Sequence, residues 1–154
     1  MSDPKKECQC TPHQIQKYLS KISGPLLGRI DLHLEVPALP SHDLMANARA
    51  ETSQAIKEHI LKARALQKGR FAGSGAAANG YMSHRQIKEF CAMDNEGKEL
   101  LKKAIDELGL SARTYDKILK VARTIADPAG SEQVQTEHLA EAIQYRSLDK
   151  NGWG

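Results

Sequence analysis

The stretch of sequence that decides the fold occupies positions 94 to 126 and reads DNEGKELLKKAIDELGLSARTYDKILKVARTIA. Its first half begins at a helix-capping residue, Asp94 or Asn95, and ends at Gly109, a common helix stop. Ser111 is the capping residue of the second half. Apolar side chains recur at helical spacing in both halves, which predicts two amphipathic helices. These side chains are Leu100, Leu101, Ile105 and Leu108, followed by Tyr115, Ile118, Leu119, Ala122, Ile125 and Ala126.

Further helices are predicted on both sides of this stretch. A segment from about Ala48 to Gln67 has helical spacing, and a short helix is expected around Ser83–Met93. The glycine-rich segment Gly73–Gly80 between them is predicted to be a loop. A last helix runs from about Thr136 to Tyr145. We therefore expect residues 41–150 to form a bundle of four or five helices. The apolar residues of the first of these segments are Ile56, Ile60, Leu61 and Leu66.

The first 40 residues have a different pattern. Thr11 followed by Pro12 is a typical helix start. From Ile30 to Val36 apolar residues alternate strictly with polar ones, which predicts a short strand with one buried face. The expected fold class is therefore mainly α, with a strand-containing unit over residues 1–40 and a frayed tail over residues 151–154.

Composition agrees with a helical protein. The chain has 154 residues, of which 40% are hydrophobic, 27% charged and only 5% aromatic, so aliphatic side chains must form its core. The net charge of +3 permits contact with phosphates without arguing for it. No apolar run is long enough for a membrane span, the first residues lack an apolar signal core, and three cysteines fit a reducing compartment. We expect a cytoplasmic protein with no membrane partner.

Most catalytic arrangements are missing from the sequence. A phosphate loop follows a strand and contains glycines that lead to a lysine and a hydroxyl residue. Gly73–Gly80 ends in neither a lysine nor a hydroxyl residue. The six histidines include no pair at the spacing of a helical zinc site. We therefore expect this chain to be inactive as an ATPase by itself.

The cysteines suggest little chemistry. Cys91 lies on the apolar side of a short predicted helix, where a buried, inert thiol is expected. Cys8 and Cys10 could supply half of a metal site at most, because structural zinc requires four ligands.

Two arginines occupy distinctive positions. Arg29 follows a Gly-Pro-Leu-Leu turn and precedes the predicted strand, and Arg113 lies in the first turn of the helix capped by Ser111. A helix N-terminus already has positive potential, so a guanidinium there is unfavourable unless an anion lies nearby. Surface charge that aids solubility is the alternative interpretation of both.

Several long motifs resemble one family. They are Asp3–Pro12, Ile15–His33, Ser111-Ala112-Arg113, Ile118–Asp127 and Ala142–Arg146. Together they span nearly the whole chain and closely resemble the magnesium-chelatase-like AAA+ ATPases. The resemblance implies the tail of the α/β ATPase core over residues 1–40, followed by the family's helical lid.

The resemblance also implies roles for particular residues. Arg29 corresponds to the arginine finger, which reaches into the ATP site of a neighbouring subunit, and Arg113 to sensor 2, which contacts the γ-phosphate from its own or an adjacent subunit. Gly28 departs from the pattern, because the family usually has aspartate there. ATP and magnesium would be bound mainly by an upstream core that carries the phosphate loop. The implied assembly is a hexameric ring that acts on DNA, promoting branch migration in natural transformation.

Two other functions are compatible with the sequence. A stand-alone helical DNA-binding or adaptor module is supported only by the pI near 8.7. The other is a metal-chelatase subunit of cofactor synthesis, although the cysteines near the N-terminus and the Ser-Ala-Arg motif argue against it. A basic run on one helix could face phosphates, but a solvated helix face is the favoured interpretation. This run comprises Lys57, Lys62, Arg64, Lys68 and Arg70.

Overall fold

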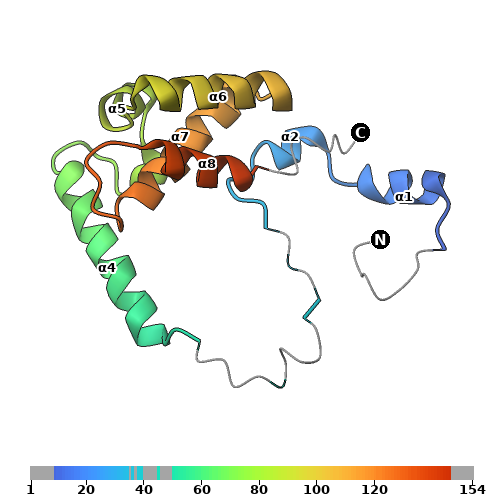
Figure 1. The fold of residues 1–154 in the computed structure, drawn as a ribbon, viewed down its shortest axis with the longest axis horizontal. Helices are drawn as coiled ribbons and strands as arrows, with labels where there is room; N and C mark the ends of the chain where they lie inside the picture. The colour runs from blue at the N-terminus through green and yellow to red at the C-terminus, as the bar shows by residue number, and fades with distance from the viewer. Residues whose placement is uncertain (1–8, 35, 37, 40–44, 46–49, 147–154) are drawn as a thin grey trace.

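The computed structural model describes residues 9–34, 36, 38–39, 45 and 50–146 (Figure 1). Throughout these residues the secondary structure is helical, and none of them belongs to a strand. No helix in this part of the chain is long and apolar enough to cross a membrane. The elements are α1 (Pro12–Leu19), α2 (Gly24–Leu27), α4 (Ser53–Arg70), the 3₁₀ turn η1 (Asn79–Tyr81), α5 (His84–Phe90), α6 (Asn95–Leu108), α7 (Ala112–Ala126) and α8 (Thr136–Gln144).

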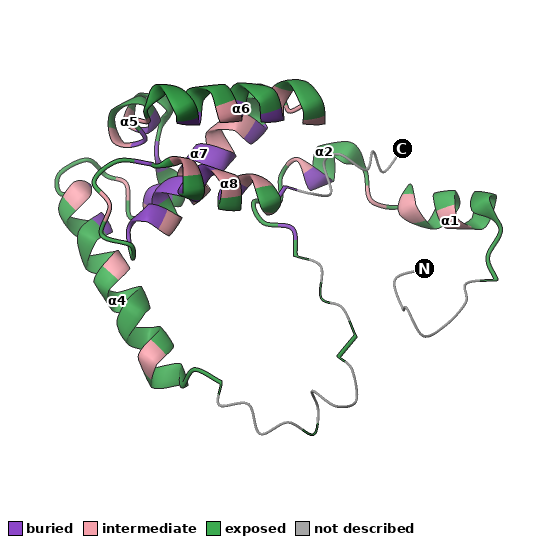
Figure 2. Ribbon diagram, viewed as in Figure 1, coloured by how far each residue is buried: buried purple, intermediate pink, exposed green. Residues whose placement is uncertain are grey.

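The core lies where α5, η1 and α8 pack against α7, with α6 packed against α8. Ile118 and Ala122 of α7 and Leu139 of α8 are completely buried, and Figure 2 shows buried positions gathered around α7. Removing a side chain as large as that of Ile118 or Leu139 from water stabilises the fold by about 1.5–3 kcal/mol. The predicted helical bundle is thus confirmed for this part of the chain. The cluster comprises Phe71, Met82, Ile87, Cys91, Leu101, Ile118, Leu119, Ala122, Val134, Leu139 and Ala142.

The helix ends of the central stretch are set by local chemistry. The carboxylate of Asp94 caps α6 by accepting a hydrogen bond from the Gly97 backbone at 2.7 Å. Gly109 ends α6 in the left-handed conformation, with φ of +61°, which glycine adopts without steric cost. A Cβ atom at position 97 would lie 2.9 Å from Leu139 Cδ1, so glycine is what allows α6 to approach α8 this closely.

The helix predicted from Ala48 to Gln67 exists as α4, but its apolar residues do not form core. Ile56, Ile60, Leu61 and Leu66 are between 44% and 56% exposed. Figure 1 shows the reason, since α4 extends away from the bundle. Only its last turn and the residue after it are buried, through Gln67 and Phe71.

The predicted strand from Ile30 to Val36 is wrong for the residues that the structure describes. Residues 30–34 and 36 adopt no strand conformation, and Ile30, Leu32, Leu34 and Val36 are 42% to 88% exposed. A strand requires a partner for its backbone and cover for its apolar face. The described chain offers no second strand, and the His33 N–H instead donates to the Tyr145 carbonyl at 2.8 Å.

Candidate functional site

Arg29 and Arg113 line the same surface hollow, although 84 positions separate them in the sequence. The hollow has a volume of about 690 Å³. Both arginines are exposed. Within the described part of the chain, neither guanidinium pairs with a carboxylate or a carbonyl, so both are available to an external anion. The remaining lining residues are His84, Ala112, Tyr115, Asp116, Lys117 and Lys120.

Arg113 reaches this hollow because α7 begins just before it. The Ser111 hydroxyl accepts a hydrogen bond from the Thr114 backbone at 3.3 Å and so fixes the start of the helix, as predicted. The first turn of α7 contains no acidic residue. The positive end of the helix dipole and the guanidinium therefore add their potentials at one place.

Arg29 is positioned by the short helix α2. Ser23 caps α2, and Leu27 anchors its end by burial. Gly28 has a φ of −60°, so this backbone does not require glycine. A Cβ atom at position 28 would lie 3.5 Å from the nearest carbonyl oxygen, which is ordinary contact, so a residue with a side chain, such as aspartate, would also fit.

Lys117 joins the Arg29 segment to α7. Its Nζ donates a hydrogen bond to the Arg29 carbonyl at 2.5 Å and pairs with Asp31 Oδ1 at 2.6 Å. The guanidinium of Arg146, which follows α8 in the chain, donates to the Ile30 carbonyl and so holds the same segment at a second point. Since Lys117 lies one helical turn after Arg113, this contact sets the separation of the two arginines.

The hollow is strongly cationic. Two arginines and two lysines line it against a single carboxylate, Asp116, which lies 3.3 Å from His84 Nδ1. Lys120 donates to the Gly80 carbonyl at 3.1 Å, so its charge is held in place without being neutralised. Guanidinium groups do not lose their protons near neutral pH, so they cannot act as general bases. The chemistry that these residues support is the binding and stabilisation of a multiply charged anion.

A second cluster of charges is buried, and the sequence patterns did not predict it. Asp127 is 1% exposed and accepts hydrogen bonds from Arg70 at 2.5 and 2.9 Å and from Arg123 at 3.0 Å. Sequence position places Arg70 in the basic run on α4, but Arg70 pairs with Asp127 and so does not belong to that exposed basic surface. One signal was present in the sequence, because Arg123 lies in the last turn of α7 and Asp127, four residues later, is its C-cap residue.

The cysteine predictions have different outcomes. Cys91 is 3% exposed and its thiol donates to the Leu119 carbonyl at 3.5 Å, so its predicted burial is confirmed. Burial raises its pKa to about 12, against weaker opposing effects of Arg123 and Arg70. Cys10 is exposed, and Cys8 lies outside the described residues. Where the structure is described, no three histidine, cysteine or acidic side chains gather as metal ligands would.

Comparison with known proteins identifies the chain's relatives. Residues 50–146 match the family described as magnesium chelatase, subunit ChlI C-terminal, and residues 1–44 match magnesium chelatase, subunit ChlI. The chain is 44% identical over 139 residues to competence protein ComM of Haemophilus influenzae, which covers 90% of this chain and 26% of that protein. It is 37% identical over 143 residues to the uncharacterized protein YifB of Salmonella typhimurium, covering 92% and 28%.

A more distant relative extends the same pattern. An uncharacterized protein of Mycobacterium bovis is 30% identical over 145 residues, covering 94% of this chain and 28% of that protein. The chain thus spans about a quarter of the length of the curated relatives it matches. The resemblance found in the sequence motifs is confirmed. The chain belongs to the magnesium chelatase ChlI family, and residues 50–146 correspond to the C-terminal domain of that family.

Proposed function

We propose that this chain is the C-terminal part of a AAA+ ATP-driven motor, with Arg29 as the arginine finger and Arg113 as the sensor-2 residue. The observation that carries the proposal is the cationic hollow that both side chains line. Its two exposed guanidinium groups suit the phosphate groups of a nucleotide, because planar guanidinium forks pair with phosphate oxygens through two hydrogen bonds.

The shared hollow has a consequence for how the two arginines act. An arginine finger works on a nucleotide held by a neighbouring subunit, where it stabilises charge that spreads over the transferring phosphoryl group. Because Arg113 lines the same hollow as Arg29, both act on that one neighbour-held nucleotide. Hydrolysis then depends on the arrangement of the subunits, and the helical bundle moves with the arginine that senses the nucleotide.

The residues in the hollow fit phosphate better than they fit magnesium. Mg²⁺ is held by carboxylate and water oxygens, and the hollow offers one carboxylate, Asp116, among four cationic side chains. We therefore assign the phosphate loop and the magnesium ligands to an upstream core outside this chain. Bound there, MgATP supplies the phosphoryl group, while Arg29 and Arg113 contribute charge stabilisation alone.

One relative supports a cellular role. The relative from Haemophilus influenzae is named a competence protein, which supports a role in natural transformation. We propose that the whole protein forms a hexameric ring in the cytoplasm and moves along DNA, promoting branch migration. The residues 1–40 then belong to the ATPase core and residues 41–150 to its lid.

The test is steady-state ATPase activity of the full-length protein. We expect Arg29→Ala to lower kcat by roughly 10³-fold, the lower end of what a trans arginine contributes. Arg113→Ala should lower kcat and raise KM for ATP. Lys68→Ala, which removes an exposed charge on α4, is the matched control and should keep wild-type activity. Hydrolysis at the wild-type rate in both arginine variants would overturn the proposal.

An immunoblot tests whether the longer protein exists. An antibody raised against this chain should detect a single band far above 17.0 kDa in lysate of the source cells. A band at 17.0 kDa would contradict the motor and favour the stand-alone adaptor instead.

A further inference from the structure

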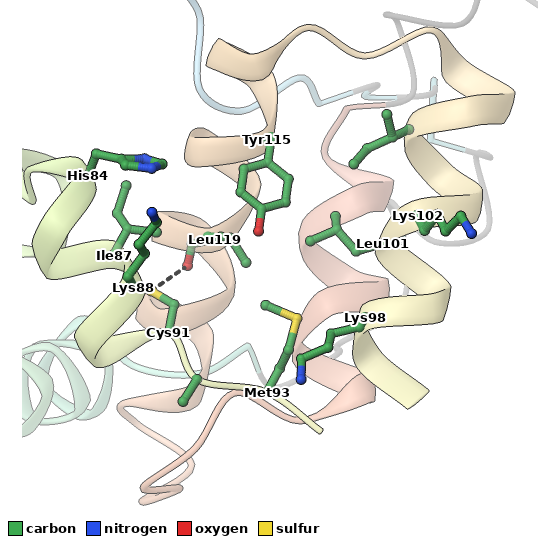
Figure 3. Close-up of a pocket in the computed structure, with 12 residues that line it drawn as sticks. His84, Ile87, Lys88, Cys91, Met93, Lys98, Leu101, Lys102, Tyr115 and Leu119 are labelled. Atoms are coloured by element: carbon green, nitrogen blue, oxygen red, sulfur yellow. Dashed lines mark hydrogen bonds between the residues drawn. The ribbon is translucent and has the colours of Figure 1, made fainter. Parts of the chain in front are cut away.

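A second hollow, separate from both arginines, lies between α5 and α6 above α7. Its volume is about 490 Å³. Ile87 of α5, Leu101 of α6 and Leu119 of α7 form its apolar wall and floor, and each is at most 3% exposed. Figure 3 shows these side chains directed into the space between the helices, with Met93 at one end. We call this feature the α5–α6 groove.

The charges along the groove have one sign. Lys88 of α5 and Lys98 of α6 extend into the space between the helices from opposite sides, whereas the ammonium group of Lys102 points away (Figure 3). No aspartate or glutamate is among the described residues that line the groove. Lys88 forms no ion pair within the described chain, and Lys98 Nζ makes only a 3.5 Å contact with Asn95 Oδ1. The groove is therefore complementary to an apolar ligand that carries carboxylates.

We propose that the α5–α6 groove binds a short, acidic, amphipathic helix of a partner protein. Apolar side chains on one face of such a helix fit between α5 and α6, as in other helix-in-groove complexes. Its flanking carboxylates pair with Lys88 and Lys98, which sets the orientation of the helix. The flexible thioether of Met93 adapts the end of the groove to side chains of different shape.

Other occupants fit the groove less well. The chain's own α1 contains no acidic residue and carries Lys17 in its last turn, so the lysines of the groove repel it. A peptide that binds as a β-strand pairs its backbone with a strand edge, and the described bundle contains no strand. Nucleic acid would pair with the lysines but gain nothing from the aliphatic floor.

Fluorescence anisotropy with a designed peptide tests the proposal. The probe is a fluorescein-labelled peptide of about 14 residues, with leucines at helical i, i+3, i+4 and i+7 positions and glutamates on both flanks. A scrambled peptide of identical composition is the control probe. We expect saturable binding of the patterned peptide to the 154-residue chain and no saturation with the scrambled one.

Protein variants locate the binding surface. Lys88→Glu combined with Lys98→Glu should weaken binding by roughly tenfold or more, because two attractions become repulsions. The matched control is Lys57→Glu with Lys62→Glu, which makes the same charge change on exposed α4 and should alter affinity by less than about twofold. Ala92→Phe, at an exposed position of the lining, should block binding by filling the groove.

The outcomes separate specific docking from general attraction. Thermal melts of each variant establish that it is folded before its affinity is compared. Equal binding of the scrambled peptide, or equal weakening by the α4 control, would mean attraction to a basic protein and would overturn the proposal. Failure of the patterned peptide to bind the wild-type chain would overturn it as well.

Discussion

At the scale of single residues, Asp127 organises the buried charges of the chain. Besides the two arginines, it accepts hydrogen bonds from Asn79 at 2.8 Å and Gln67 at 3.2 Å. Burial by itself raises the pKa of this carboxyl, but the hydrogen bonds from Arg70 and Asn79 and the charges of Arg70 and Arg123 outweigh it. The net result is a pKa below the ordinary value of 3.8. The cluster ties α4, η1 and α7 together at one point.

We predict that Asp127→Asn destabilises the chain at pH 7 by roughly 3 kcal/mol, because it leaves the buried guanidinium of Arg123 and the partly buried one of Arg70 without their counter-ion. The pH dependence follows from the lowered pKa. The carboxylate stabilises the fold above pH 3.8, and this contribution is lost as the pH falls through the lower pKa of the folded state. Wild-type stability should therefore fall below about pH 4 more steeply than that of the variant.

Urea denaturation at pH 7 and at a series of acidic pH values measures both effects. Asp116→Asn is the matched control, because Asp116 is partly exposed and contacts only His84. It should cost less than about 1 kcal/mol. An equal loss in the two variants would contradict the role given to Asp127.

Cys91 provides a second prediction at this scale. With its thiol 3% exposed and its pKa raised to about 12, it should resist iodoacetamide at pH 8 in the folded protein. Cys10, which is exposed, serves as the internal control and should react. Mass spectrometry after digestion measures both, and denaturation in urea should make Cys91 react. Rapid labelling of Cys91 in the native chain would show that its site opens.

Local chemistry explains which residues could be predicted from the sequence. The capping roles of Asp94 and Ser111 depend on positions three residues away, so the sequence contains the information. The burial of Cys91 follows from its place among apolar neighbours. The pairing of Arg70 with Asp127 spans 57 positions, and no local pattern encodes a partner at that distance.

At the scale of elements, helix spacing does not by itself reveal what a helix packs against. α4 has apolar residues at suitable intervals, yet it extends from the bundle and buries only its final turn (Figure 2). Helical spacing predicted α7 correctly because its apolar stripe meets α5, η1 and α8. Segment 30–36 shows the same limit, since alternation indicates a strand only where a sheet exists to pair with it.

We predict that the same substitution destabilises the chain far more on one of these two kinds of helix than on the other. Leu139→Ala in α8 should destabilise the chain by about 2–5 kcal/mol, because it leaves a cavity in the core. Leu61→Ala in α4, where the side chain is 56% exposed, should cost less than about 0.5 kcal/mol. Chemical denaturation measures both. A large loss for Leu61→Ala would mean that α4 is covered in solution.

Lys117 carries a prediction about the link between α7 and the Arg29 segment. Lys117→Met removes the bonds to the Arg29 carbonyl and to Asp31, so hydrogen exchange at the His33 amide should accelerate about fivefold. Lys120→Met, one turn away and bonded to Gly80 instead, is the matched control. Unchanged exchange at His33 in the Lys117 variant would mean that the contacts with Tyr145 and Arg146 hold this segment in place without Lys117.

At the scale of the whole molecule, the bundle brings two distant arginines together. Sequence motifs singled out Arg29 and Arg113 separately, but only the packing of segment 27–33 against α7 places them in one hollow. Spacing could not predict that proximity, because it depends on long-range contacts such as that between Lys117 and Arg29. Because both arginines line one hollow, we propose that both act on a single nucleotide held by a neighbouring subunit.

The most direct measurement of that claim is the ATPase activity of mixed oligomers of the full-length protein. One type of subunit carries Arg29→Ala and Arg113→Ala, and the other keeps both arginines but has a disabled phosphate loop. Each type alone should be inactive. Mixing should restore activity, because intact arginines then meet intact phosphate loops across subunit boundaries. A mixture that stays inactive, although its oligomers form, would contradict the account.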